Sequence, residues 1–262
     1  MKKLRIDLHN HTYLCNHASG TMEEYVQEAI NKGIDIFGFS CHAPMNFDIK
    51  YRMTLEEMDI YENEIFRLQE VYKDKIKILF AYEVDYLPPY IEPKVISKNV
   101  DYFIGSVHFI NKWGFDNPEF IGGYDTKDID TIWGEYFDAI SKMANTRLFD
   151  VVGHLDLIKV FKYLPNKDIK EIAYDALKEI QKANMTIEVN PAGLRKPIEE
   201  IYPSYDLLKI AHSLNIPITL GSDAHKIEQI GYGYNEALTL ISSVGYKNVQ
   251  YFEKREPKVV IF

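Results

Sequence analysis

Residues 76–83 read Ile-Lys-Ile-Leu-Phe-Ala-Tyr-Glu, a nearly continuous apolar run that ends in one carboxylate. Such a short run predicts a strand over 76–82 that is buried on both faces, as in a parallel sheet. Further strands of this kind are predicted on either side of it, at 4–8, 34–40, 102–107, 151–153, 185–189 and 216–220. Apolar residues at helical spacing predict helices at 21–32, 54–72, 132–144, 168–183 and 204–214.

The alternation of strands and helices favours an α/β fold with seven strand-plus-helix units, and a parallel barrel more than an open sheet. The helix at 21–32 carries end signals, since Thr21 is a candidate N-cap, Glu24 completes a capping box and Gly33 marks the stop. With 262 residues, 46% of them hydrophobic, the chain can bury one sizeable core. Because no linker, repeat or low-complexity segment divides it, we expect a single domain over 1–262.

The composition excludes several classes of function. A net charge of −9 argues against a nucleic-acid surface, which needs clustered Lys and Arg. No run approaches the roughly 18 apolar residues of a membrane span, and residues 1–11 do not build the apolar segment of a signal peptide. Cys15 and Cys41 give no disulfide framework, so a cytoplasmic location is the simplest expectation. We therefore expect a small-molecule partner, and no feature indicates an oligomeric state.

Side chains with metal-binding groups gather at the predicted strand ends. Seven of the eight histidines and two acids lie there, and only His212 lies elsewhere. Because the carboxyl ends of parallel strands converge on one face, these side chains could meet in one place. The set is His9, His11, His17, His42, Glu83, His108, His154, Asp223 and His225.

Two positions near these strand ends allow more than one interpretation. The two-residue period of a strand puts Asp7, His9 and His11 on one side, where the two imidazoles can grip one ion. Asp7 is then a candidate acceptor for a ligand's ring N–H, or the partner of a helix end or a lysine. Glu83, after a strongly apolar run, is either the bridge between two cations or half of a salt bridge.

The nine nitrogen and oxygen ligands include no thiolate and are too many for one tetrahedral ion. They suit two or three divalent ions such as zinc, manganese or iron. Ions held close together lower the pKa of bound water and neutralise a phosphoryl group. Phosphate-ester hydrolysis is therefore the reaction that fits best.

The order of these residues, together with longer strings, resembles the PHP (polymerase and histidinol phosphatase) superfamily of metal-dependent phosphoesterases. The strings similar to its histidinol-phosphate phosphatase branch are GSVHF at 105–109, WGFDNPE at 113–119, GHLDLIKVF at 153–161, EVNPAGLRKP at 188–197 and GSDAH at 221–225. The resemblance covers the whole chain and implies a distorted (β/α)7 barrel of the TIM type. It also implies hydrolysis of L-histidinol phosphate to L-histidinol and phosphate, a step of histidine biosynthesis.

By position, the resemblance implies three divalent metal ions (zinc, manganese or iron), with Glu83 bridging the first two. The other ligands would be His9, His11 and Asp223 for the first ion, His108 and His154 for the second, and His17, His42 and His225 for the third. The mechanism we expect is in-line attack by a hydroxide that bridges the first two ions. Either Asp223 or a metal-bound water would then protonate the leaving alkoxide.

Substrate-binding residues are expected in the loops around this centre. Arg195, in the segment that matches the family's G-x-R pattern, is the expected phosphate clamp, because a planar guanidinium grips an anion with two hydrogen bonds. Asn190 and Ser106 are candidates for neutral hydrogen bonds to the phosphate monoester. Arg52 and Lys159 are further cationic candidates, although Lys159 could instead cover a helix surface.

Two long strand-to-helix connections, 45–53 and 111–126, are rich in aromatic residues and are expected to shape the pocket. These residues could enclose an imidazole ring or simply roof the barrel. They are Phe47, Tyr51, Trp113, Phe115, Phe120 and Tyr124.

Other functions stay open as alternatives at this point. A PHP-type protein-tyrosine phosphatase or another small phosphomonoesterase would use the same ions. An exonuclease would need a basic groove, which this acidic chain lacks. A non-catalytic metal-binding barrel would have lost bridging ligands, whereas Glu83 and Asp223 are present. A deaminase or amidohydrolase would carry a lysine on a middle strand, where this chain has Glu83.

Overall fold

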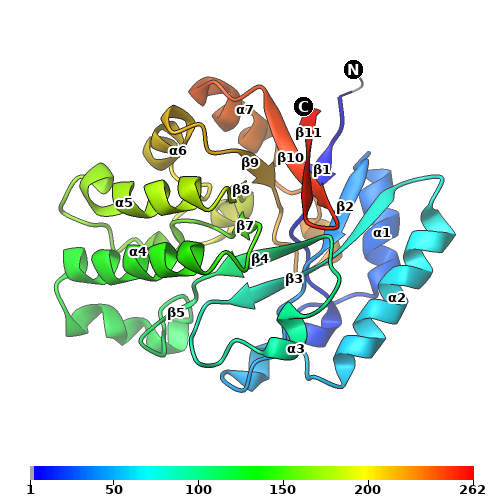
Figure 1. Cartoon of the computed structure of the whole chain (residues 1–262), viewed down its shortest axis with the longest axis horizontal. Helices are drawn as coiled ribbons and strands as arrows, with labels where there is room; N and C mark the ends of the chain where they lie inside the picture. The colour runs from blue at the N-terminus through cyan, green and yellow to red at the C-terminus, as the bar shows by residue number, and fades with distance from the viewer. Residues whose placement is uncertain (1–2) are drawn as a thin grey trace.

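The computed structural model describes residues 3–262. Its main sheet is a nearly closed barrel of seven parallel strands, as predicted, in the order β1-β2-β3-β4-β7-β8-β9 (Figure 1). These strands are β1 (Ile6–Asp7), β2 (Ile36–Phe39), β3 (Lys77–Asp85), β4 (Tyr102–Ser106), β7 (Val151–Val152), β8 (Thr186–Val189) and β9 (Ile218–Leu220). The first and last strands meet where Leu8 N–H donates to Leu220 O over 2.9 Å. All seven carboxyl ends therefore lie at one end of the barrel.

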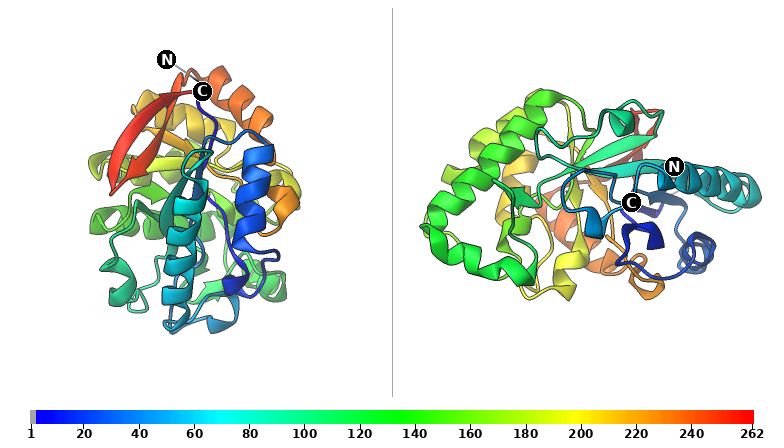
Figure 2. Two further views of the ribbon diagram at one scale, coloured as in Figure 1. Left: turned by 90° about the vertical axis from the view of Figure 1, so that its right-hand side faces the viewer. Right: turned by 90° about the horizontal axis from the view of Figure 1, so that it is seen from below.

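Helices pack around the outside of the barrel (Figure 2). They are α1 (Met22–Asn31), α2 (Glu57–Tyr72), α4 (Ile129–Thr146), α5 (Ile169–Lys182), α6 (Tyr205–Ser213) and α7 (Tyr234–Val244), of which α7 is missing from the sequence prediction. Between β3 and β4 the chain forms only the short α3 (Pro93–Ile96). Pro88, Pro89 and Pro93 crowd this segment, and proline prevents a long helix. The seven units are therefore not equivalent.

Two hairpins add to the predicted elements. One, formed by β5 (Phe109–Ile110) and β6 (Trp113–Gly114), follows β4. The other, formed by β10 (Asn248–Glu253) and β11 (Glu256–Ile261), ends beside the amino-terminal segment in Figure 1. There Leu4 N–H donates to Ile261 O over 3.1 Å, so that the C-terminal hairpin joins the first strand of the barrel.

Element boundaries follow from local hydrogen bonds. The capping box of α1 is present as predicted, with Thr21 and Glu24 each accepting from the other's backbone N–H. Helix α2 begins at Glu57, three residues later than predicted, and Thr54 accepts the Glu57 N–H ahead of it. Strand β3 continues to Asp85, because its ladder with β4 extends that far. Glu83 therefore lies inside the strand rather than after it.

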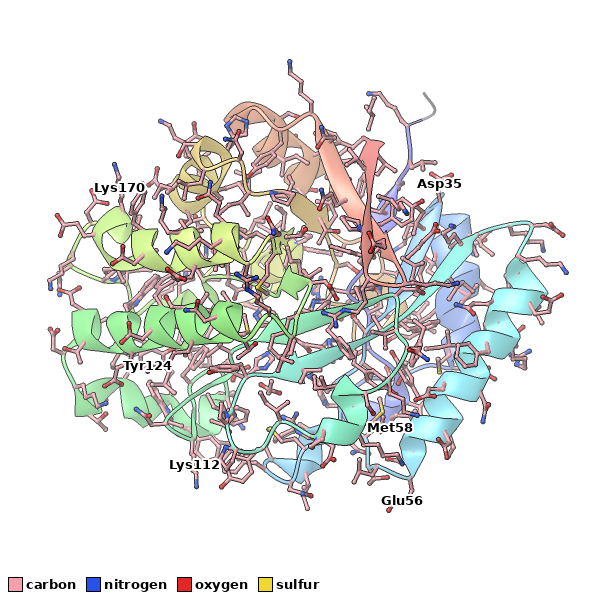
Figure 3. The ribbon with its side chains drawn as sticks, viewed as in Figure 1. Asp35, Glu56, Met58, Lys112, Tyr124 and Lys170 are labelled. Carbon is pink, nitrogen blue, oxygen red and sulfur yellow. The ribbon has the colours of Figure 1, made fainter. Side chains whose placement is uncertain are left out.

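One large apolar core fills the barrel and the space beneath the helices. Figure 3 labels two side chains near the start of α2 that show this division, Met58, which is fully buried, and Glu56, which is exposed. Burial of apolar area is the main stabilising contribution to such a fold. It fixes the strand ends that carry the polar side chains.

Candidate metal centre

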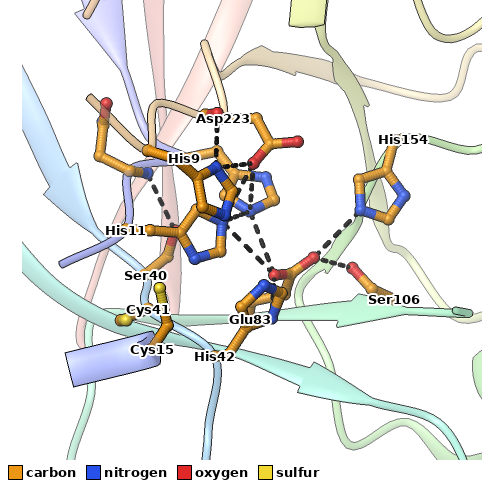
Figure 4. A network of polar contacts seen from close by, with 12 residues as sticks. His9, His11, Cys15, Ser40, Cys41, His42, Glu83, Ser106, His154 and Asp223 are labelled. Atoms are coloured by element: carbon orange, nitrogen blue, oxygen red, sulfur yellow. Dashed lines mark hydrogen bonds and ion pairs between the residues drawn. The ribbon is translucent and has the colours of Figure 1, made fainter. Parts of the chain in front are cut away.

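The predicted ligands converge at the carboxyl end of the barrel around the carboxylate of Glu83 (Figure 4). Its Oε2 lies 2.8 Å from His42 Nδ1 and 3.4 Å from His9 Nε2. Its Oε1 lies 3.1 Å from His154 Nε2. Because β3 stands between β1 and β7 in the sheet order, one carboxylate reaches imidazoles on both sides.

The inner half of the centre comprises His9, His11, Glu83, His108, His154 and Asp223. Two sets of its ligand atoms lie within 4.8 Å of one another, namely those of His9, His11 and Glu83 and those of Glu83, His108 and His154. The Oδ1 atom of Asp223 lies 3.0 Å from His11 Nε2, which joins the carboxylate to the first set. His9, His11 and Glu83 are at most 1% exposed, whereas the side chains of His108 and Asp223 are 12% and 17% exposed and line the cavity, so this half is buried on its barrel side and open on its cavity side.

The outer half comprises His17, His42, His225 and Cys15, a residue that the sequence analysis did not place at the site. Ligand atoms of His42, His225 and the inner His11 lie within 4.8 Å of one another, and so do those of Cys15, His17 and His225. The side chains of His42 and His225 are 13% and 24% exposed. This half therefore lies closer to solvent than the inner half.

Imidazole nitrogens in both halves are buried without a hydrogen-bond partner among residues 3–262: His11 Nδ1, His154 Nδ1 and His225 Nε2. Buried polar atoms are otherwise almost always paired, so these atoms call for another partner. Imidazole nitrogens and carboxylate oxygens are the donors that zinc, manganese and iron accept. The residues therefore fit divalent cations.

Among the side chains alone, charge already binds the inner half together. Burial opposes ionisation of Glu83, but His42 and His9 outweigh it and hold the pKa of Glu83 well below its ordinary value. Burial also opposes protonation of His9, yet Glu188 and Glu83 raise its pKa well above the usual range. In the outer half, by contrast, burial lowers the pKa of His42 to about 4. An ion entering the inner half must therefore displace protons.

Two carboxylates that sequence reasoning missed orient the inner imidazoles. Glu188 Oε1 lies 2.7 Å from His9 Nδ1, and Asp85 Oδ1 lies 2.7 Å from His108 Nδ1. Such contacts fix the ring tautomer and leave the opposite nitrogen for a metal. A signal for Asp85 was present, because the two-residue strand period puts it on the same side as Glu83. Glu188 is likewise one strand period before Asn190.

The structure does not place Asp7 against a ligand's imidazole, the first of the alternatives considered for it. Its carboxylate accepts hydrogen bonds from Ser222 N–H and Oγ at 2.8 and 2.6 Å, and from Gly231 N–H at 2.9 Å. Asp7 therefore joins β1 to the segment after β9. The two-residue spacing from His9 is correct, but closure of the barrel brings the backbone of the last strand nearer than any ring nitrogen.

Arg195 lies at the site, in a short 3-10 helix (Pro191–Arg195) after β8. Its Nη2 donates to the carbonyl oxygens of Ser222 and Asp223, each over 3.0 Å, and its buried Nη1 has no hydrogen-bond partner within residues 3–262. Its guanidinium also stacks 4.9 Å from the ring centroid of Tyr232. One edge of the group is thus anchored while a donor stays free.

The other substrate candidates are engaged by protein groups. Ser106 donates to Glu83 Oε1 over 2.6 Å, and Asn190 Nδ2 donates to Glu188 Oε2 over 3.1 Å. Both side chains are fully buried, which favours a role in holding ligands over contact with substrate. Arg52 reaches the cavity wall but is paired with Asp85 at 2.9 Å.

Lys159 was considered as a cation for the phosphate or as cover for a helix surface, and the structure supports neither role. It is 2% exposed, and its Nζ lies 2.9 Å from Asp156 Oδ2 and 2.8 Å from Glu200 Oε2. Nζ also donates to Ile201 O over 2.9 Å. Lys159 therefore ties the segment after Arg195 to the end of β7.

A cavity of about 550 Å³ opens above the metal centre. Of the predicted aromatic residues, Tyr51 and Phe120 line it, whereas Phe115 and Tyr124 are buried in the core. Residues that the sequence analysis did not select also line the cavity; among them are Asp116, Glu119 and Lys196. The aromatic loops therefore shape the pocket only in part. No helix in residues 3–262 is long and apolar enough to cross a membrane.

A nearly closed parallel barrel that gathers imidazoles and carboxylates around one glutamate defines a metal-dependent hydrolase. Residues 7–192 match the PHP domain family, and residues 207–243 match a PHP-associated family. The chain belongs to the PHP family, as the resemblance implied.

Relatives and solved structures agree with this membership. A "Probable histidinol-phosphatase" of Deinococcus radiodurans is 36% identical over 95% of this chain and 97% of its own length. The histidinol-phosphatase of Bacillus subtilis is 28% identical over 88% of this chain and 97% of its own length. The crystal structure of a histidinol phosphate phosphatase from Lactococcus lactis, complexed with zinc, L-histidinol and phosphate, superposes with a TM-score of 0.81. That match has 25% identity and covers 97% of this chain and 98% of the other.

Proposed function

We propose that this chain hydrolyses L-histidinol phosphate to L-histidinol and inorganic phosphate. The observation that carries the proposal is the cavity, whose lining includes both residues of the metal centre and Arg195. A phosphate group between the two would meet positive charge on both sides, which stabilises the charge that develops during ester cleavage. The relatives named for this reaction support the choice of substrate.

Three divalent ions, with zinc as first choice, would occupy the centre in this proposal. When bound, they would supply an activated water and neutralise the phosphoryl oxygens. The proposed ligands, with Glu83 shared by the first two ions, are His9, His11 and Asp223, then His108 and His154, then His17, His42 and His225. The contacts of Glu83 with both His9 and His154 support its bridging role.

Arg195 would bind the phosphate in a fixed orientation. The two backbone carbonyls that hold its Nη2 prevent the side chain from swinging away, and the unpaired Nη1 supplies a charged donor. Lys196 also lines the cavity and adds a second positive charge there. A charged donor that is oriented before binding loses little entropy when the anion arrives.

The remaining cavity wall suits an amine beside an imidazole, which are the two other groups of histidinol phosphate. Asp116 offers a carboxylate for the ammonium group. Burial raises the pKa of Asp116, so pairing with a cation would relieve an unfavourable environment. Tyr51 and Phe120 offer aromatic faces for a flat ring.

Asp223 is better suited to hold a metal than to donate a proton. Burial opposes its ionisation, but His9 and His11 outweigh it and hold its pKa well below the ordinary value. A carboxyl that stays ionised at neutral pH has no proton for the leaving alkoxide. We therefore assign protonation of the leaving group to water.

Initial rates of phosphate release from L-histidinol phosphate, phosphotyrosine and an aryl phosphate test the substrate. We expect kcat/KM for histidinol phosphate to exceed the other two by about 100-fold or more, since the cavity pairs charges with amine and phosphate together. D116N should lose much of this preference while still cleaving the aryl phosphate. Equal or greater efficiency with phosphotyrosine would favour a protein-tyrosine phosphatase instead.

A further inference from the structure

Cys15 lies against the outer half of the centre, although the N- and O-donor sets leave it without a role. It is fully buried, and its Sγ lies 4.0 Å from His17 Nε2. Ligand atoms of Cys15, His17 and His225 all lie within 4.8 Å of one another. Figure 4 shows its sulfur and that of Cys41 close to His11.

The ring tautomers of His17 and His225 leave the Nε2 atom of each ring available beside the Cys15 sulfur. His17 Nδ1 lies 2.8 Å from Cys15 O and His225 Nδ1 lies 3.2 Å from Asp223 O, so each ring donates an N–H to a carbonyl. That tautomer leaves Nε2 of both rings as an acceptor or metal ligand. His225 Nε2 is buried with no hydrogen-bond partner in the described part of the chain, residues 3–262, an observation independent of the cysteine.

We propose that the Cys15 sulfur is a ligand of the outermost metal ion, together with His17 and His225, and that it makes this site selective for thiophilic divalent ions such as zinc. The inference rests on the metal centre of the proposed function but not on its substrate. Ligands at about 2.3 Å for sulfur and about 2.0 Å for nitrogen around a tetrahedral ion stand about 3.5 Å apart. The observed 4.0 Å between Sγ and Nε2 needs only a small closure.

Cys41 is the competing thiol, and its contacts argue against it. Its sulfur accepts hydrogen bonds from Thr12 N–H and Oγ1, both over 3.3 Å, on the side of the barrel wall. Cys15, Cys41 and His11 also form a compact set, but His11 Nε2 already lies 3.0 Å from Asp223 Oδ1. Cys41 is therefore the matched control, a second buried thiol in the same neighbourhood.

A sulfur ligand divides the centre into two chemical types. The inner half offers only nitrogen and oxygen, which accept manganese and iron as readily as zinc, whereas thiolate ligation favours zinc. In full-length protein given a mixture of zinc and manganese, zinc should therefore occupy the outer half in preference to manganese. Replacement of Cys15 should remove this preference for zinc.

The test is the absorption spectrum of the full chain loaded with cobalt(II), which reports sulfur ligation without any assay of activity. A thiolate bound to cobalt(II) gives an intense near-ultraviolet charge-transfer band that nitrogen and oxygen ligands do not give. We expect the band in the unchanged protein and in C41A, and its loss in C15A and C15S. Binding of one cobalt ion should weaken by more than about tenfold in the Cys15 variants while the inner ions stay bound.

Two results would overturn the proposal: no charge-transfer band in the fully loaded unchanged protein, or a band that survives in C15A and vanishes in C41A. If the Cys15 variants do not fold, X-ray absorption at the zinc edge of C41A decides, because one sulfur among its ligands is expected there and none would contradict the assignment. Phosphate release is measured separately. A band without histidinol phosphate hydrolysis would refute the proposed function and leave this inference standing.

Discussion

The inner and outer halves of the metal centre are built by different means. In the inner half, His9 and His108 are each held by a buried carboxylate at 2.7 Å. In the outer half, the nearest partners of His17 Nδ1 and His225 Nδ1 are backbone carbonyl oxygens, at 2.8 and 3.2 Å, and the Asp223 carboxylate lies farther from His225 Nδ1, at 3.5 Å. Charged partners bind a ligand more tightly than neutral ones. The inner half is therefore shaped before metal arrives, whereas the outer half depends more on the ion itself.

The largest expected effect comes from the residue shared within the inner half. E83Q keeps the shape of the side chain but removes the charge around which five imidazoles gather, so kcat should fall by roughly 1,000-fold or more. Metal analysis should show loss of inner ions along with activity. The control E70Q changes an exposed carboxylate, 75% accessible, and should alter neither quantity. Full metal content and activity in E83Q would remove Glu83 from the bridging role.

The next effect tests whether the carboxylates behind the inner imidazoles matter. E188Q and D85N should each weaken metal binding by about 10- to 100-fold, because an amide no longer fixes the ring tautomer or offsets its charge. Competition with a coloured chelator measures this affinity. Ions of the outer half should leave at the unchanged rate, and their equal loss would show that the two halves are not separable.

How much of this centre was visible in the sequence depends on the kind of residue. The convergence of the candidate ligands could be predicted because strand ends meet wherever a parallel barrel forms. Glu188 was hidden, because a buried carboxylate reveals its partner only when β8 and β1 are brought together. The partners of Asp7, Ser222 and Gly231, were hidden for the same reason. Cys15 could not be predicted from a pattern of nitrogen and oxygen ligands, although its neighbour His17 belongs to that pattern.

Substitution of Arg195 separates the two functions of the site, because it should change the binding of substrate and leave the binding of metal unchanged. R195A should raise KM for phosphate esters by about 10- to 100-fold, which is the value of one or two charged hydrogen bonds, with metal content unchanged in both halves. R195K should recover only part of the loss, since an ammonium lacks the planar fork. Steady-state kinetics with metal analysis on the same samples checks this. Unchanged KM in R195A would place the phosphate elsewhere.

The smallest effect is in the pH dependence of stability after the ions are stripped by a chelator. Burial disfavours the cation of His108, but Asp85 outweighs it and raises its pKa from 6.5 to about 10. Its contribution is complete below pH 6.5 and is lost as pH rises toward 10. His42, lowered to about 4, acts in the opposite direction, because the unfolded chain takes up a proton first as pH falls from 6.5.

Urea denaturation of the stripped protein at several pH values measures both slopes. H108Q should flatten the loss of stability above pH 6.5, and H42Q should flatten the loss below it. If the stability of the stripped protein instead rose above pH 6.5 and also rose below it, the charge states of His108 and His42 would be assigned the wrong way round. Protein reloaded with metal should show neither slope, since bound ions replace the protons.

The most direct test of the account is zinc titration of the stripped protein, with phosphate release from L-histidinol phosphate followed at each step. The account predicts no release without metal, and activity that reaches its maximum as zinc fills the centre and is absent at every step in E83Q. Phosphate release by the stripped protein, or by zinc-loaded E83Q at the unchanged rate, would contradict it.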